Sequence, residues 1–330
     1  MTSTTQLAIN IEDVQRAAAR VADAAVRTPL LEFAPLNERA GRRVLVKFEG
    51  AQHTGSFKFR GAYNRLSQLT DAQRSAGVVA WSSGNHAQGV AAAACLLDLP
   101  ATIVMPADAP RMKLENTRSL GAEIVTYDRF TESREEIARA LAASLGAVLV
   151  PSFDDPHVIA GQGTAGLEIM EQASELGVRI RQVLVCCGGG GLVAGIATAI
   201  KATDPSIDIH SVEPEAFDDT ARSLRSGRRE TVDRGARSIC DALLAPSPGE
   251  LTFPINQRLL TSGLVVRDDQ VRDAMRFAFG SMKLVIEPGG AVALAAILGG
   301  IAPSCEEASV IVVSGANVDP QLYADILHSS

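Results

Sequence analysis

The chain has 330 residues, enough for about two domains of roughly 150 residues each. Hydrophobic residues make up 46% and charged residues 21%, which excludes disordered, collagen-like and disulfide-scaffold proteins. A net charge of -7 and only 4% aromatic residues argue against a nucleic-acid partner, which would need basic or stacking surfaces.

The five cysteines are odd in number and have no CxxC spacing, so we expect neither a disulfide framework nor a zinc site. The segment 1–13 lacks the basic and apolar regions of a signal peptide. No uncharged apolar run reaches about 18 residues, so we expect no membrane span. These features predict a cytoplasmic enzyme or binding protein.

Short apolar segments alternate with helical patterns along most of the chain. In chain order, the expected strands are 44–48, 77–81, 101–105, 123–127, 147–150, 183–187, 207–212, 264–266 and 309–313. The expected helices are 86–97, 111–120, 132–145, 164–176, 192–202, 269–284, 291–298 and 320–327. Continuous apolar strands separated by helices predict parallel sheets with helices on both faces.

The number of strands favours two sheets, because more than about eight strands would strain one open sheet. We therefore predict an α/β fold of two doubly wound domains. The segment 151–163 is a plausible crossing point between them. The charged, irregular segment 214–248 is more typical of an excursion or lid than of a linker.

The segment Thr54-Gly55-Ser56-Phe57-Lys58 follows a predicted strand and places a lysine at the start of a helix. The positive end of a helix is an unfavourable place for a cation. One interpretation is an ordinary solvated lysine. The other is an amine with a lowered pKa that acts as a nucleophile and forms Schiff bases with carbonyl cofactors.

Two further segments join a strand to the residues that follow it. Ser82-Ser83-Gly84-Asn85-His86 could be a helix cap, and its free N–H groups could also bind a carboxylate. Ser314-Gly315-Ala316-Asn317 follows the strand 309–313 and by itself indicates only a turn.

Four consecutive glycines, 188–191, lie between a strand and a helix, where their N–H groups can converge on a phosphate. Gly189, Gly191 and Ala194 also match the dinucleotide-binding pattern, and Glu213 ends the next strand, where a ribose-binding acid would lie. A Rossmann dehydrogenase therefore remains an alternative.

In the order SFK, SSGNH, GGGGL, VEP, EPGGA and SGAN, these segments resemble the fold-type-II pyridoxal-phosphate (PLP) enzymes, in the branch of threonine/serine dehydratases and serine racemase. The resemblance extends from Thr28 to Asn317. It implies a tryptophan-synthase-beta-like fold, with a large domain of residues 1–78 and 153–330 and a small domain of residues 79–152. It also implies a homodimer or homotetramer.

The resemblance implies a role for individual residues toward the cofactor. Lys58 would hold its aldehyde as a Schiff base, Phe57 would lie beside the ring, Asn85 would bind the ring hydroxyl and Ser314 would meet the pyridine nitrogen. The phosphate would be held by Gly188, Gly189, Gly190, Gly191 and Leu192. Two further residues that would border the cofactor are Gly235 and Glu287. Asp233-Arg234-Gly235 replaces the usual Ala-Asp-Gly, which weakens the assignment of Gly235.

The resemblance also implies residues for the substrate and for a divalent cation. The substrate carboxylate would be surrounded by Ser82, Ser83, Gly84 and His86. A magnesium or manganese ion would be bound by Glu213, the backbone of Phe217 and Asp219. A solvated acidic turn that caps the next helix is the other interpretation of these acids.

The expected activity is that of a threonine/serine ammonia-lyase, with Lys58 as the general base. A hydroxyl partner such as Ser314 would not hold the pyridine nitrogen protonated, which favours β-elimination. A serine or aspartate racemase would use Ser83 as a second base. A 3-hydroxyaspartate dehydratase would need a cation for the second carboxylate, and Arg134 is the candidate, unless it forms a surface ion pair. Ser56, where hydroxyaspartate enzymes tend to have alanine, favours threonine or serine.

Overall fold

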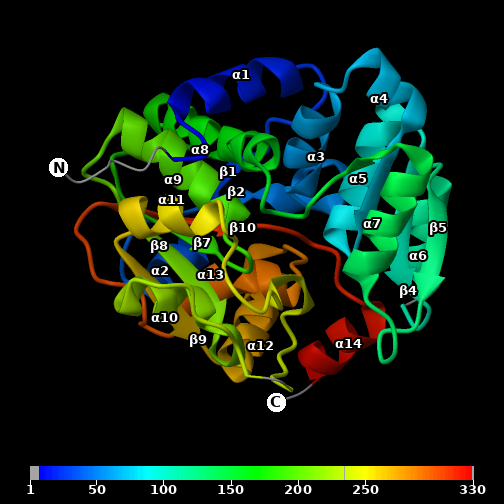
Figure 1. The fold of residues 1–330 in the computed structure, drawn as a ribbon. Coiled ribbons are helices and arrows are strands. Elements are labelled where there is room, and N and C mark those ends of the chain that lie inside the picture. Colours follow the sequence, from blue (N-terminus) through cyan, green and yellow to red (C-terminus); the bar gives the residue numbers. More distant parts are fainter. Residues whose placement is uncertain (1–6, 83, 110, 234, 329–330) are drawn as a thin grey trace.

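The computed structural model describes residues 7–82, 84–109, 111–233 and 235–328, and its strands form two sheets (Figure 1). The larger sheet has the order β1-β2-β10-β7-β8-β9, and only β1 is antiparallel to its neighbour. Its strands are β1 Leu30–Glu32, β2 Val44–Phe48, β7 Ile180–Cys186, β8 Asp208–Pro214, β9 Ser262–Val266 and β10 Ala308–Val313.

The smaller sheet is parallel throughout and has the order β5-β4-β3-β6. Its strands are β3 Val78–Trp81, β4 Ala101–Pro106, β5 Glu123–Tyr127 and β6 Val148–Leu149. Every strand predicted from the sequence is confirmed to within a few residues, as is the α/β class. The short edge strand β1 carries no periodic pattern of its own and was not predicted.

Helices surround both sheets (Figure 1). Their bounds are α1 Ile11–Val21, α2 Ala34–Ala40, α3 Lys58–Leu66, α4 Asp71–Ala76, α5 Asn85–Leu96, α6 Arg111–Ser119, α7 Arg134–Leu145, α8 Pro156–Glu175, α9 Gly191–Thr203, α10 Asp219–Ser226, α11 Thr252–Leu259, α12 Asp268–Phe277, α13 Pro288–Leu298 and α14 Pro320–His328. None of the helices in the described part of the chain is long and apolar enough to cross a membrane.

The structure corrects two predicted helical boundaries and the description of one segment. Helix α8 begins at Pro156, not at 164, because Asp155 caps it by accepting from the N–H groups of His157 and Val158. The predicted helix 269–284 ends at Phe277 and continues as one π-helical turn. The segment 214–248 is not irregular throughout, since it contains α10.

The sequence did not predict the start of α8 because this part of the helix contains glycines, which are poor helix formers. Here they let helices approach closely. A Cβ on Gly161 would lie 2.7 Å from the Arg60 carbonyl oxygen in α3, and one on Gly163 would lie 2.8 Å from the Gly195 carbonyl oxygen in α9. The packing of α8 between α3 and α9 therefore outweighs the low helix propensity of its glycines.

Helix α3 connects the two sheets, because it packs against both α5 and α8. The strands of the smaller sheet lie within residues 78–149, but Phe59, Ala62 and Leu66 of α3 enter the apolar core of that sheet. The division of the chain at residues 79 and 152 thus stays a prediction.

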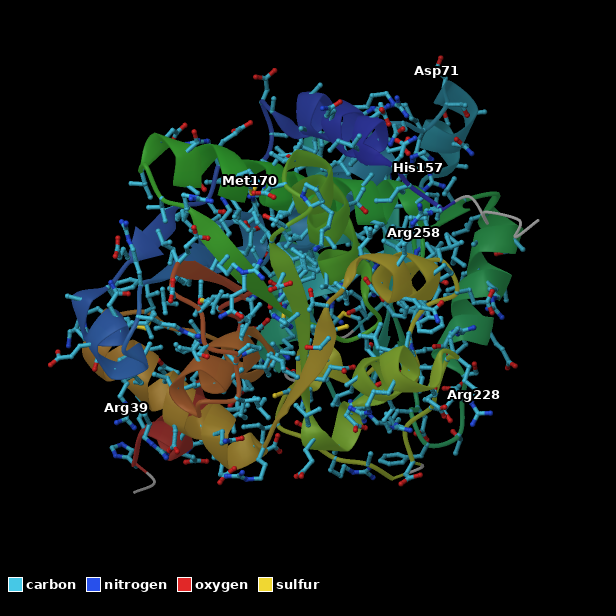
Figure 2. The ribbon with its side chains drawn as sticks, turned by 90° about the vertical axis from the view of Figure 1, so that its left-hand side faces the viewer. Arg39, Asp71, His157, Met170, Arg228 and Arg258 are labelled. Carbon is cyan, nitrogen blue, oxygen red and sulfur yellow. The ribbon has the colours of Figure 1, made fainter. Side chains whose placement is uncertain are left out.

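Most charged side chains lie at the surface, as Figure 2 shows for Arg39, Asp71 and Arg228. One charged cluster lies in the interior, where the side chains of Lys47, Glu49 and Arg60 are fully buried. We call these three residues with Glu168 the buried charge cluster. It joins β2, the turn after β2, α3 and α8.

Every charge in the buried charge cluster has hydrogen-bonded partners. Arg60 donates to both carboxylate oxygens of Glu49 at 2.8 and 2.9 Å and to both oxygens of Glu168 at 2.6 and 2.8 Å. Lys47 Nζ donates to Glu168 at 2.6 Å and to Gln172 at 2.9 Å. Burial alone would raise the pKa of Glu49, but Arg60 and Lys47 outweigh it and lower that pKa.

Removing one member of the buried charge cluster should destabilise the fold strongly. We expect Glu49→Ala to lower the free energy of unfolding by about 3–5 kcal/mol, because Arg60 stays buried with one of its two carboxylate partners removed. Urea unfolding measures this change. Glu115→Ala, which breaks an exposed ion pair with Arg111, is the control and should leave the midpoint unchanged. Equal losses in the two variants would contradict the prediction.

Candidate active site

The carboxyl ends of neighbouring parallel strands meet at one edge of the larger sheet. The order β2-β10-β7 places there the segments that lead to Lys58, Ser314 and the glycines 188–191. In open α/β sheets, ligands bind in the crevice at this edge. The fold therefore brings together three of the segments that the sequence analysis selected.

Lys58 begins α3, and its Nζ donates a 2.7 Å hydrogen bond to the carbonyl oxygen of Ser152. Burial lowers the pKa of Lys58 to about 8, although the nearby Cys186 and Glu287 oppose the shift. Helix α5 approaches the backbone of Lys58 closely, since a Cβ on Gly89 would lie 3.0 Å from the Lys58 carbonyl carbon. The amine is thus held in a confined position, and a larger fraction of it is neutral near neutral pH than for an ordinary lysine.

Two of the glycines 188–191 occupy positions where a larger residue would not fit without strain. Gly190 has a φ of +91°, and a Cβ on Gly189 would lie 2.4 Å from the ring of Phe153. The carbonyl of Gly189 accepts from the Thr252 hydroxyl at 2.6 Å, which fixes the loop. No side chain caps the start of α9, so its N-terminal N–H groups are suited to an anion such as a phosphate. Leu192 is buried in the first turn of that helix.

Asn85 begins α5 and takes part in a chain of hydrogen bonds. Its Nδ2 donates to Glu287 Oε1 at 2.7 Å, and its Oδ1 accepts from Asn317 Nδ2 at 2.8 Å. Burial raises the pKa of Glu287 to about 8, so its carboxyl group is largely protonated at neutral pH. Beside Asn85, a Cβ on Gly84 would meet no atom within 4 Å, so this position faces open space.

His86 is a neutral side chain in this structure. Burial first, and then Lys58, lower the pKa of His86 to about 3. Its Nε2 lies 2.9 Å from the carbonyl oxygen of Val150, which can only accept, so Nε2 carries the hydrogen. Nδ1 is buried and has no partner among the described residues. His86 therefore offers an acceptor, not a positive charge, to its surroundings.

Ser314 lies beside the loop that leads to Lys58. Its carbonyl oxygen accepts from the N–H of Phe57 at 3.1 Å, and an antiparallel bridge joins Ser56 to Gly315. Ser314 is buried, and so is the neighbouring thiol of Cys186, whose pKa burial raises to about 12. The thiol therefore stays protonated at neutral pH.

The other predicted site residues are spread over three regions. Ser83 lies outside the described residues. Gly235 has a φ of +95° and lies in an irregular segment, with no atom within 4 Å of a Cβ placed there. Arg134 is 46% exposed and pairs with Glu135 at 3.2 Å, as the surface ion-pair interpretation expected. It also lines a polar cavity of about 440 Å³ at the carboxyl ends of β4 and β5.

Glu213 and Asp219 are buried near the start of α10, and Phe217 is buried between them. The two oxygens of Glu213 accept from the N–H groups of Thr220 and Ala221 at 2.8 and 2.7 Å. Burial raises the pKa of Asp219 to about 7, and its Oδ2 has no partner among the described residues. No group of three or more His, Cys, Asp or Glu side chains that could hold a metal occurs in the described part of the chain.

Both oxygens of Glu213 accept from backbone N–H groups at the start of α10, an arrangement that the dehydrogenase alternative did not predict.

The sequence analysis did not single out Ser152, Phe153 or Asn317. The first two carry no motif and contact the site only through the fold, at Lys58 and at Gly189. Asn317 was part of a selected segment, but nothing in the sequence linked its side chain to Asn85.

The family model described as pyridoxal-phosphate dependent enzyme matches residues 21–315. The chain belongs to this family. It is 45% identical over 315 residues to an L-threo-3-hydroxyaspartate ammonia-lyase from Pseudomonas sp, covering 96% of this chain and 97% of that protein.

Two solved structures have the same fold over nearly the whole chain. A threonine deaminase from T.th. has a TM-score of 0.88 and 44% identity, and covers 94% of this chain and 99% of its own. Maize serine racemase has a TM-score of 0.91 and 38% identity, and covers 96% of each chain. The family and fold that the sequence analysis expected are therefore confirmed.

The residues of the crevice fit the family's cofactor, pyridoxal phosphate. It needs an uncharged lysine amine for its aldehyde and an anion site for its phosphate. Lys58, with its lowered pKa, and the glycine loop at the start of α9 supply both.

Glu287→Gln should change how the stability of the cofactor-free protein depends on pH. The pKa of Glu287 in the folded protein is about 8 and its ordinary value is 4.5, so between these values the folded protein holds a proton that the unfolded chain releases. The free energy of unfolding therefore falls as the pH rises through this range, by up to about 1.4 kcal/mol per pH unit.

The glutamine keeps an acceptor for Asn85 but does not titrate. In the variant, the free energy of unfolding should therefore fall less steeply as the pH rises. Urea unfolding at a series of pH values across the range measures it. Identical slopes in the two proteins would show that Glu287 is ionised in the folded state.

Proposed function

We propose that this protein is a PLP-dependent ammonia-lyase that acts on a small β-hydroxy amino acid, L-threonine or L-serine, and releases a 2-oxo acid and ammonia. The observation that carries the proposal is the confined Lys58 amine with a pKa of about 8, at the same edge of the larger sheet as the glycine loop. Relatives named as ammonia-lyases and a threonine deaminase support it.

When bound, the cofactor would supply a carbonyl that exchanges Lys58 for the substrate amine, which frees the Lys58 amine, and a ring that would withdraw electrons from Cα. Lys58 would bind the aldehyde, Phe57 would lie beside the ring and Ser314 would meet the ring nitrogen. Asn85 would bind the ring hydroxyl, and Gly235 and Glu287 would border the ring. The phosphate would be bound by Gly188, Gly189, Gly190, Gly191 and Leu192.

Lys58 would supply the general base. With a pKa of about 8, a useful fraction of its amine is neutral near neutral pH. The neutral Nζ can take the proton from Cα of the bound amino acid. The hydrogen bond to the Ser152 carbonyl limits the positions that the amine can occupy.

The loop Ser82–Asn85 would bind the substrate carboxylate. It lies at the N-terminus of the twelve-residue helix α5, where backbone N–H groups favour an anion, and Gly84 faces open space. Ser83 is assigned to this loop from the sequence. The neutral His86 cannot pair with the carboxylate as a cation.

Ser314 would bias the reaction toward elimination. Its hydroxyl has no negative charge with which to keep a ring nitrogen protonated, as a carboxylate would. A weaker electron sink would stabilise negative charge at Cα less, which would favour loss of the hydroxyl from Cβ over reprotonation of Cα.

Lys58→Ala tests the proposal. The wild type should bind PLP with an absorption band in the visible region and should release 2-oxo acid from L-threonine or L-serine. The variant should lose this band and essentially all turnover, because no amine remains to bind the aldehyde or to take the Cα proton. Lys201→Ala, at the far end of α9, is the control and should keep both. Full activity of Lys58→Ala would reject the proposal.

A second candidate substrate is 3-hydroxyaspartate. Arg134 and Arg129 line the cavity of about 440 Å³ at the carboxyl ends of β5 and β4, on the edge of the sheet that also carries Ser82–Asn85 after β3. A second carboxylate could bind there. A relative named L-threo-3-hydroxyaspartate ammonia-lyase supports this candidate.

Arg134→Ala distinguishes the candidates. If 3-hydroxyaspartate is a substrate, the variant should lose about 10- to 100-fold in kcat/KM for it, the effect of one charge-assisted hydrogen bond, and little for L-threonine. Arg111→Ala is the matched control, because Arg111 is an exposed arginine on α6, the helix between β4 and β5 in the chain. Equal losses for both substrates would argue against a role for Arg134 in recognition.

We also propose that Glu213, Asp219 and the carbonyl of Phe217 bind magnesium or manganese. Two adjacent buried carboxylates with raised pKa values, one with an unpartnered oxygen, fit a hard cation that prefers oxygen ligands. Either ion should raise the thermal midpoint of the wild type and raise that of Asp219→Asn much less. Equal shifts would mean that the ion binds elsewhere.

The proposal includes a homodimer or homotetramer, as the resemblance implies. It also includes a reducing compartment, since all five cysteines are free.

A further inference from the structure

The side chain of Asn85 is held from two sides, by residues more than 200 positions away in the sequence. Asn317 Nδ2 donates to Asn85 Oδ1 at 2.8 Å, a separation of 232 residues. Asn85 Nδ2 donates to Glu287 Oε1 at 2.7 Å, a separation of 202 residues. An asparagine amide has one acceptor and two N–H donors, so these contacts decide which end of the amide faces which neighbour and leave one N–H over.

Asn317 is itself fixed in place. Its Nδ2 also donates to the Thr54 carbonyl oxygen at 2.6 Å, so both of its N–H groups are directed. Its Oδ1 lies against Gly55, where a Cβ would come within 2.8 Å and where φ is +72°. The N–H of Ala316 donates to the Gly55 carbonyl at 2.9 Å. The segment that follows β10 is thus attached to the loop that leads to Lys58.

Glu287 is suited to accept from Asn85. It is 2% exposed and sits at the N-cap of α13, and its backbone N–H donates to the Gly315 carbonyl at 3.1 Å. A Cβ on Gly315 would lie 2.4 Å from Glu287 Oε1, so the glycine makes room for the carboxyl group. The position of Oε1, and with it the direction of the Asn85 N–H, follows from this packing.

We propose that Asn317 is a positioning residue that fixes the orientation of the Asn85 amide, with Glu287 accepting from one of its N–H groups, so that the remaining N–H, and not the oxygen, faces the cofactor. The inference rests on the proposed function, in which Asn85 binds the ring hydroxyl. If the amide were turned over, its oxygen would face the ring oxygen, and two acceptors would meet.

Substitutions of Asn317 test the proposal through the dissociation constant for pyridoxal 5'-phosphate and the absorption band of the holoenzyme. Asn317→Ala removes one of the two restraints on the amide and should raise the dissociation constant about 2- to 10-fold. Asn317→Asp is nearly isosteric, but its carboxylate repels Asn85 Oδ1 and favours the inverted amide. It should therefore weaken binding more than alanine does and should shift the absorption band.

The double variants with Asn85→Ala decide whether Asn317 acts through Asn85. Without the Asn85 amide, neither substitution at 317 should change the dissociation constant further. Asn64→Ala is the control, because Asn64, which is more buried than Asn317, also donates to a backbone carbonyl, that of His157 in α8, at 2.7 Å. It should leave the dissociation constant and the band unchanged.

Two outcomes would overturn the proposal. If the substitutions at 317 have the same effect with and without the Asn85 amide, or if aspartate is no worse than alanine, Asn317 does not act by orienting Asn85, and the proposed function is unaffected. If the wild type does not bind pyridoxal 5'-phosphate, the proposed function fails and this inference fails with it.

Discussion

The position of Lys58 depends on the buried charge cluster that holds α3. Arg60 lies two residues after Lys58, and its guanidinium binds Glu49 after β2 and Glu168 on α8. A guanidinium buried in this way is tolerated only with its full set of partners, because unpaired buried charges cost several kcal/mol. The cluster therefore restricts how α3 can be oriented relative to the larger sheet. The first residue of that helix is the amine on which the proposed chemistry depends.

Lys58 and Arg60 are both buried side chains of α3, but their pKa values shift in opposite directions. Both side chains are removed from water. Arg60 has two carboxylates within hydrogen-bond distance, and these outweigh burial and raise its pKa. Lys58 has a carbonyl oxygen at 2.7 Å and no such carboxylate, so burial prevails and lowers its pKa to about 8. The fold thus keeps Arg60 as a charged structural group, whereas Lys58, as we propose, serves as a base and nucleophile.

The pKa values of the buried acids also depend on whether a cation lies within hydrogen-bond distance. Glu49 is paired with Arg60, and its pKa is lowered. Glu287 faces an amide and has no guanidinium partner, and burial raises its pKa to about 8. Glu213 and Asp219 lie close to each other, and burial raises both pKa values. Where a buried carboxyl lacks a cation, it becomes a hydrogen-bonding group or, as we propose for Glu213 and Asp219, a site for a cation from solution.

The sequence by itself determined the α/β class, the strands and the segments around Lys58, Asn85, Ser314 and the glycines 188–191. These are local features, since an apolar strand, a turn that requires glycine and a helix start are each recognised within about ten residues. What only the tertiary structure decided depends on contacts between distant segments. Helix α8 begins at Pro156 despite its glycines, the pKa of Lys58 is lowered by burial, and Asn317 reaches Asn85 across 232 residues. Such contacts leave no periodic signal, because each involves one side chain at a position that the rest of the fold brings close.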